Sequence, residues 1–244
     1  DHFSSRYKNV IDVIKSPKIE QDNHALVFLP GSDFVCGGEY QIGNTNDIPS
    51  GNYLVADNVL TPFGSLNLLA RWIGRGFKGE AMHYANMCDL KKYVSHPERT
   101  ILVCHVPRRF DHLEEAVDMA EFGEASIDFI LNGRVVSKNS IFPFSNAQKL
   151  TDTGHPITLK KENRGNVHLR ALYDALDIRK AVTGHFHESA HRACDSQGKH
   201  VQEGEKVEEL FWNASYLDGM KAGILSVDDT SVCYKNIDLR DYFS

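Results

Sequence analysis

Two histidines placed two residues apart, His185 and His187, follow a short apolar segment at 180–182. Residues i and i+2 of a strand point to the same side, so both imidazoles would face one point if strand geometry continued through them. If the chain turned there instead, Gly184 would let the backbone approach a ligand closely. In either case the pair offers two nitrogen donors of the kind that suits a borderline divalent metal.

Polar side chains follow two other apolar segments. His105 ends the segment 99–104, and Ser32 and Asp33 follow the segment 25–29 through a Pro-Gly pair. Short apolar runs bounded by such residues are typical of buried strands. Ligands in open α/β sheets gather at the carboxyl ends of strands. The sequence therefore predicts that these donors and the two histidines meet at one edge of a sheet.

The order of these segments resembles the calcineurin-like metallophosphoesterase family. That family carries Asp-x-His, Gly-Asp-x-x-Asp, Gly-Asn-His-Asp/Glu, a lone strand-end His and Gly-His-x-His, in this order. The last two motifs match fully, at His105 and at 184–187, and the third matches in place but not in letters, at 31–34. The first is absent, and the second is at most cut through at Asp1. The segment 211–217 is similar to the strand and Asn-containing turn that follow Gly-His-x-His in the family.

The resemblance covers roughly residues 1 to 240 and implies a fold class. The expected fold is an α/β, two-sheet metallophosphoesterase-like sandwich, in which mixed β-sheets are flanked by helices and the metal cleft lies at strand ends. Residues 1–244 would form one calcineurin-like phosphoesterase domain that lacks its first strand. The separation of His105 from His185 (185 − 105 = 80 residues) is longer than compact members need, so we expect an insertion at 132–165. It would act as a substrate lid or a partner surface.

The resemblance also implies a dinuclear site with two divalent metal ions, Mn, Fe, Zn or Ni. His105 and His185 would bind one metal and His187 the other. Ser32 stands where the family has an amide ligand, and Asp33 stands where it has a histidine proton donor. Asp33 would then be a metal ligand or, with a raised pKa, a catalytic proton donor; we favour the ligand. Such metals activate a bridging water, orient the phosphate and stabilise charge during an in-line displacement.

Two arginines close to His105, Arg108 and Arg109, could clamp a phosphate of the substrate by bidentate hydrogen bonds. The alternative is a solvated loop. The glycine-rich segment 74–79 lacks Gly-Lys-Ser/Thr and is interpreted as a solvated turn. The segment 36–51 is rich in Gly, Asn and Asp and is expected to be a functional loop beside the metal site.

Two functions from different classes follow. The first is a metallophosphoesterase that hydrolyses a phosphomonoester or phosphodiester with a metal-activated water. The second is a catalytically degenerate scaffold that binds protein partners through the insertion at 132–165. The histidine motifs favour the enzyme, because a scaffold has no physical need for converging imidazoles.

Composition narrows the partners and the location. The chain has 244 residues, of which 41% are apolar and 25% charged, with a formal net charge of −6. The acidic balance argues against a nucleic-acid coat protein but leaves room for a nucleotide or nucleic-acid substrate in a local basic cleft. No apolar run is long enough to span a membrane. Five cysteines without a Cys-x-x-Cys pair suit a reducing compartment, so we expect a cytoplasmic protein.

Apolar spacing assigns the remaining elements. Helices are expected over 6–16, 81–94, 113–122 and 167–176, with Asn166 as the N-cap of the last. Strands are expected over 25–30, 52–59, 64–73, 99–105, 126–131, 180–182, 209–213, 223–227 and 231–237, of which 64–73 also fits helical spacing.

Overall fold

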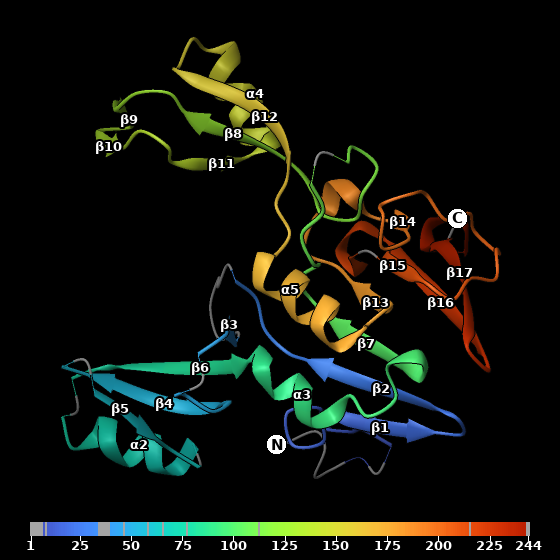
Figure 1. The fold of residues 1–244 in the computed structure, drawn as a ribbon. Helices are drawn as coiled ribbons and strands as arrows, with labels where there is room; N and C mark the ends of the chain where they lie inside the picture. Colours follow the sequence, from blue (N-terminus) through green and yellow to red (C-terminus); the bar gives the residue numbers. More distant parts are fainter. Residues whose placement is uncertain are drawn as a thin grey trace.

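Four parallel strands form the centre of the computed structural model (Figure 1). The structure describes residues 7, 9–33, 40–45, 47–57, 59–64, 66–76, 78–111, 113–214 and 216–242. Its central sheet has the order β1-β2-β7-β13-β15-β14. The strands are β1 (Lys18–Gln21), β2 (His24–Leu29), β7 (Thr100–Cys104), β13 (Lys180–Thr183), β14 (Ala193–Cys194) and β15 (Leu210–Asn213). The described part of the chain is thus mixed α/β.

The pairing directions place four carboxyl ends at one edge of this sheet. β2 pairs with β7, β7 with β13 and β13 with β15, each time in parallel. The outer strands β1 and β14 are antiparallel to their neighbours. The strands predicted at 25–30, 99–105, 180–182 and 209–213 are therefore confirmed, and the segments that follow β2, β7, β13 and β15 leave the sheet on the same side.

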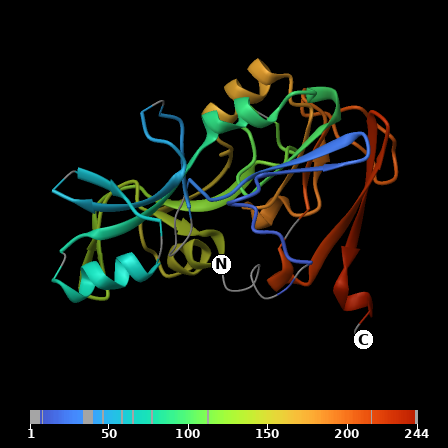
Figure 2. The same cartoon turned by 90° about the horizontal axis from the view of Figure 1, so that it is seen from below.

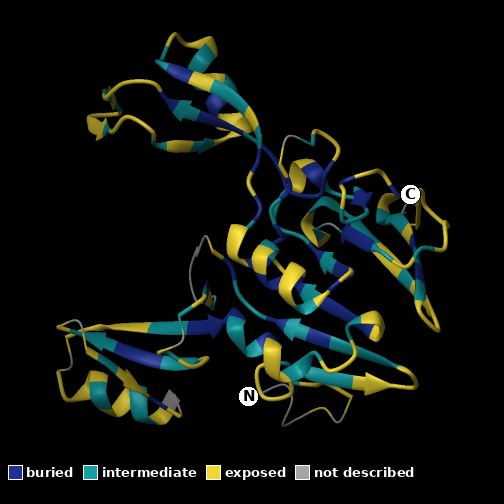
Figure 3. Ribbon diagram, in the orientation of Figure 1, coloured by how far each residue is buried: buried dark blue, intermediate teal, exposed yellow. Residues whose placement is uncertain are grey.

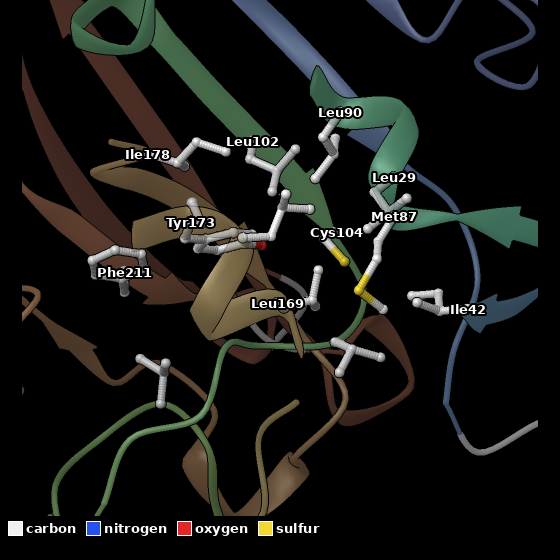
Figure 4. Close-up of a cluster of buried hydrophobic side chains, with 14 of the residues drawn as sticks. Leu29, Ile42, Met87, Leu90, Leu102, Cys104, Leu169, Tyr173, Ile178 and Phe211 are labelled. Atoms are coloured by element: carbon white, nitrogen blue, oxygen red, sulfur yellow. The ribbon is translucent and has the colours of Figure 1, made fainter. Parts of the chain in front are cut away.

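Both faces of the central sheet are covered, because successive residues of its strands point to opposite faces. Leu102 and Phe211 face a cluster that contains Leu169 and Tyr173 of α5 (Val167–Leu176) (Figure 4). The residues adjacent to these in the strands, Ile101 and Trp212, point to the opposite face and belong to a second cluster. Fully burying such a side chain contributes about 1.5–3 kcal/mol relative to leaving it exposed.

The second cluster is closed by a hairpin of two long strands. β16 (Lys221–Asp228) pairs with β17 (Ser231–Asp238), and Val232 and Tyr234 of β17 pack against the central sheet. The strands predicted at 223–227 and 231–237 are confirmed. They form a two-stranded sheet of their own, whereas β15 belongs to the central sheet.

The segment between β2 and β7 forms a first lobe (Figure 1). Its four-stranded sheet has the order β3-β6-β4-β5. The elements are β3 (Gln41–Gly43), β4 (Gly51–Ala56), β5 (Val59–Pro62), α2 (Leu66–Gly74), β6 (Glu80–Asn86), η1 (Met87–Asp89), α3 (Leu90–Tyr93) and η2 (Pro97–Arg99). The strand predicted at 64–73 is wrong, and the helical alternative holds. The helix predicted at 81–94 is wrong in its first half, because β6 is paired on both sides, with β3 and β4.

The segment between β7 and α5 forms a second lobe, which projects away from the central sheet (Figures 1 and 2). A three-stranded sheet β11-β8-β12, a hairpin β9-β10 and one helix make up this lobe. The elements are β8 (Met119–Ala125), β9 (Phe129–Leu131), β10 (Arg134–Val136), β11 (Ile141–Pro143), α4 (Phe144–Asp152) and β12 (Ile157–Asn163). The expected insertion at 132–165 is therefore ordered, and its sheet begins earlier, at Met119.

Three further predictions differ from the structure, two in this lobe and one near the amino-terminal end. The helix predicted at 113–122 ends in β8, since seven consecutive residues of β8 pair with β12 and outweigh local preference. The predicted strand at 126–131 is limited to β9. Within the predicted helix at 6–16, residues 9 and 13–15 lie in turns, residues 10–12 and 16 have no regular structure, and residues 6 and 8 lie outside the described residues. A short helix, η4 (Leu217–Gly219), precedes β16, and another, η5 (Leu239–Tyr242), follows β17. Among the described helices, none has the length and apolar character required to cross a membrane.

Candidate functional site

The segment after β2 reaches the site through a turn that requires glycine. Gly31 has φ +101°, and a Cβ there would lie 2.2 Å from the carbonyl oxygen of Tyr40. The next residue, Ser32, is buried and is fixed by two backbone bonds: its N–H donates to Tyr40 O, and its carbonyl accepts from Ile42 N. Asp33 then follows with a partly exposed carboxylate.

His105 and His185 meet at the carboxyl ends of β7 and β13. His185 Nδ1 lies 3.1 Å from His105 Nε2, within hydrogen-bond distance, and the rings are edge to face with centroids 4.9 Å apart. The backbone supports this contact, because Gly184 N–H donates to the carbonyl oxygen of His105 at 3.0 Å. The predicted convergence of these two histidines is thus observed.

His185 adopts a backbone conformation that is costly for its residue type. Its φ is +66°, and Phe186 N–H donates to Gly184 O at 2.8 Å across it, the hydrogen bond of a three-residue turn. Such conformations cost about 1–3 kcal/mol in non-glycine residues and cluster at functional sites. The turn ends strand geometry after Thr183 and directs the ring of His185 toward His105.

The Asp33 carboxylate is held between His185 and a residue that the motifs did not indicate, Asn166. Asp33 Oδ1 lies 3.6 Å from His185 Nε2, and Asp33 Oδ2 accepts a hydrogen bond of 3.2 Å from Asn166 Nδ2. Asn166 Oδ1 accepts from the backbone N–H groups of His168 and Leu169, which fixes the orientation of the amide. The N-cap role of Asn166 was predicted from sequence, but nothing in its spacing indicated the contact with Asp33.

His187 is separated from this cluster. It begins η3 (His187–Ser189), and its ring stacks on Tyr216 with centroids 3.8 Å apart and 5° between the planes. No hydrogen bond joins His187 to any described residue of the cluster. Of the two alternatives for this pair, the continued strand does not hold, and the chain turns at His185, so the two imidazoles do not face one point.

Arg108 has a structural position rather than one open to a substrate. Its side chain is only 6% exposed, its Nη1 lies 3.0 Å from Asp174 Oδ1, and its guanidinium lies over the rings of Phe110 and Phe211. The prediction that Arg108 binds the phosphate is corrected by this burial. Arg109 stays a candidate, because it is partly exposed and its backbone N–H donates to Asn166 O at 3.1 Å.

A buried carboxylate fixes the segments that carry these residues. Asp118 is fully buried and accepts hydrogen bonds from Phe110 N, Gly165 N and Asn163 Nδ2. Burial raises its pKa above the ordinary value, against the opposing effect of these donors. Asp118 therefore links the segment after β7 to the segment that begins α5.

The donor set suits a borderline divalent ion by chemistry. Two nitrogens that bind one tetrahedral ion lie about 3.4 Å apart, close to the His105–His185 separation. The Asp33 carboxylate, however, approaches the other nitrogen of His185, so the three donors form a chain. In keeping with this, the described residues contain no group of three His, Cys, Asp or Glu side chains arranged to hold one ion. A third ligand would require rotation of a side chain.

The described residues do not include every predicted part of the site. Asp1 and residues 36–39 and 46 of the predicted 36–51 loop fall outside the described residues. A cavity beside the end of β2 has a volume of about 110 Å³, and Phe28 and Tyr40 are among the residues that line it. The histidine cluster does not line it.

Comparisons with protein-family models, with curated proteins and with solved structures found no match for this chain.

Proposed function

We propose that this protein is a metal-dependent phosphoesterase of the calcineurin-like type, which hydrolyses a phosphomonoester or a phosphodiester. The observation that carries the proposal is the convergence of Asp33, His105 and His185, which come from three different strand ends. Ligands in α/β sheets gather at such an edge. The strained backbone of His185 adds support, since strain of this kind persists where function requires a fixed geometry.

Each residue has a role in this proposal. Asp33, His105 and His185 would hold a divalent ion such as Mn, Fe, Zn or Ni, with His187 and Ser32 as further ligands of a two-metal site. When bound, such ions supply an activated water and stabilise charge on the phosphate. Asn166 holds the Asp33 carboxylate in place, and Arg109 would contact the phosphate oxygens. The two-sheet sandwich is part of the same proposal, with β16 and β17 contributing to its second sheet.

Hydrolysis of simple phosphate esters tests the proposal. The purified protein, supplied with Mn or Zn, should release nitrophenol from a nitrophenyl monoester or from the corresponding diester. H105A and D33N should each lower the rate about 100-fold or more, because each removes a ligand. H200A is the matched control, since His200 is an exposed histidine outside the site and its loss should leave the rate unchanged. Absence of hydrolysis with both Mn and Zn would refute the proposal that this protein is a phosphoesterase.

A protein-binding scaffold is the second candidate function, and one observation favours it. Ile130 and Val135 are cross-strand partners in the β9–β10 hairpin and are 70% and 73% exposed. Phe129 and Val136 on the other face of the hairpin pack into the second lobe. Exposed apolar groups of this kind mark interaction surfaces. Absence of metal binding together with absence of hydrolysis would leave this function.

A further inference from the structure

The first lobe carries a basic and aromatic surface in an otherwise acidic chain. Residues 58–79 contain Arg71, Arg75 and Lys78 and no acidic residue, while the whole chain has a net charge of −6. We call Arg71, Trp72, Arg75 and Lys78 the α2 surface. The three basic side chains are exposed, and among the described residues none of them forms an ion pair. This differs from Arg108, Arg109, Arg164, Arg170, Arg179 and Arg240, which all have carboxylate partners.

The helical backbone brings these groups together. Arg75 N–H donates to Arg71 O and Trp72 O, so helical hydrogen bonding continues to Arg75 just past the end of α2. Residues three and four apart on a helix are neighbours, so Arg75 lies beside both Trp72 and Arg71. Beside them lies a hollow of about 380 Å³ lined by Thr61, Trp72, Arg75 and Gly76. An indole and a guanidinium therefore line one open depression.

We propose that the α2 surface binds single-stranded nucleic acid, with a base stacked on Trp72 and backbone phosphates held by Arg71 and Arg75. Aromatic side chains flanked by basic residues bind single strands because every base offers a π-face and every linkage a negative charge. A hollow lined by an indole and a guanidinium suits an inserted base. The idea that single-stranded nucleic acid is the substrate of the phosphoesterase rests on the proposed function. The idea that the α2 surface binds single-stranded nucleic acid does not.

The chain offers an internal reporter for the test. It has two tryptophans, and the second, Trp212, is 2% exposed and donates its indole N–H to Asn236 Oδ1. Quenching of tryptophan fluorescence by an added oligonucleotide therefore reports on Trp72. A short oligothymidylate is titrated into the full chain in a low-salt buffer that contains a metal chelator. Because the proposed hydrolysis requires metal ions, the oligonucleotide is not cleaved during the titration. Failure to bind then overturns this inference alone, and failure to hydrolyse overturns only the proposed function.

The expected result is saturable quenching. The logarithm of the binding constant should fall linearly with the logarithm of the salt concentration, with a slope of about 0.7 per phosphate contact. R75E should weaken binding about tenfold, and W72L should remove the quenching. R99E is the matched control, because Arg99, at the amino end of β7, is exposed and forms no ion pair with any residue that the structure describes. Equal loss with R75E and R99E, absence of binding at low salt, or binding to anionic lipid vesicles in place of the oligonucleotide would each overturn the proposal.

Discussion

Asn166 is the residue whose single side chain connects helix stability to the site. Its Oδ1 caps α5 and its Nδ2 donates to Asp33, so the two functions of the amide can be separated by substitution. The same reasoning applies to His185, where the side chain belongs to the site and the backbone carries the strain.

N166D should keep the helix cap and damage the site. Asp is as good an N-cap as Asn, so the cap itself should be kept, and N166D should lose less stability than N166A. Its second oxygen would face the Asp33 carboxylate in place of a donor, so phosphoesterase activity should fall. N166A should lose about 1 kcal/mol of stability and activity as well. Urea unfolding and the nitrophenyl assay measure both effects, and an N166D variant with full activity would refute the role given to Nδ2.

H185G should be more stable than H185A by about 1 kcal/mol. Both variants lose the imidazole, but only alanine keeps a Cβ that strains a backbone at φ +66°. The greater freedom of glycine in the unfolded chain opposes this gain in part. Chemical denaturation of the two variants gives the comparison directly. Equal stability, or a more stable H185A, would mean that the left-handed conformation is not maintained at this position.

At the scale of elements, the Asp118 carboxylate joins the segment after β7 to the start of α5, and this junction should depend on pH. Burial raises its pKa in the folded state, so the folded protein binds the proton more tightly than the unfolded chain. Its contribution to stability is full below its ordinary pKa of about 3.8 and is lost as the pH rises through the raised value.

The stability of the native protein minus that of D118N should therefore fall as the pH rises from about 4 toward neutrality. Urea unfolding of both proteins across this range measures the difference, and subtraction removes the titration of the other carboxylates. A difference that rises with pH would show that the hydrogen bonds to Asp118 outweigh its burial.

Two strands of the central sheet carry thiols that should be inert. Burial raises the pKa of Cys104 in β7 and of Cys194 in β14 to about 12 in each case. At pH 8 only about one in ten thousand of such thiols is ionised, and the thiolate is the reactive form. Iodoacetamide followed by peptide mass spectrometry should find Cys88 and Cys233 modified first, since both are partly exposed. Rapid labelling of Cys104 in the folded protein would contradict the packing around β7.

The elements show which parts of this fold follow from the sequence. The parallel strands were predictable because β2, β7, β13 and β15 are short apolar runs with clear boundaries, and α5 because it has an N-cap and one apolar face. β6 and β8 were not, since their residues favour helices locally and become strands only by pairing with distant segments. Likewise the convergence of His105 and His185 was predictable from strand ends, whereas the turn at His185 and the Asn166–Asp33 contact depend on tertiary structure.

For the whole molecule, the carboxyl-end edge of the central sheet is the meeting point of the site residues and of the segments that lead into both lobes (Figure 1). Exposed side chains are frequent on both lobes, whereas the central strands are mostly buried (Figure 3). Under the proposed function, chemistry would take place at the sheet edge and the lobes would bind substrate or partners.

Metal content is the measurement that tests the central claim most directly. The protein is incubated with Mn or Zn, dialysed exhaustively and analysed by plasma mass spectrometry beside H105A and H200A. We expect about two ions per chain, as in a dinuclear hydrolase, with clear loss in H105A and none in H200A. A native protein that retains no metal, or an H105A variant that retains as much as the native protein, would contradict the account.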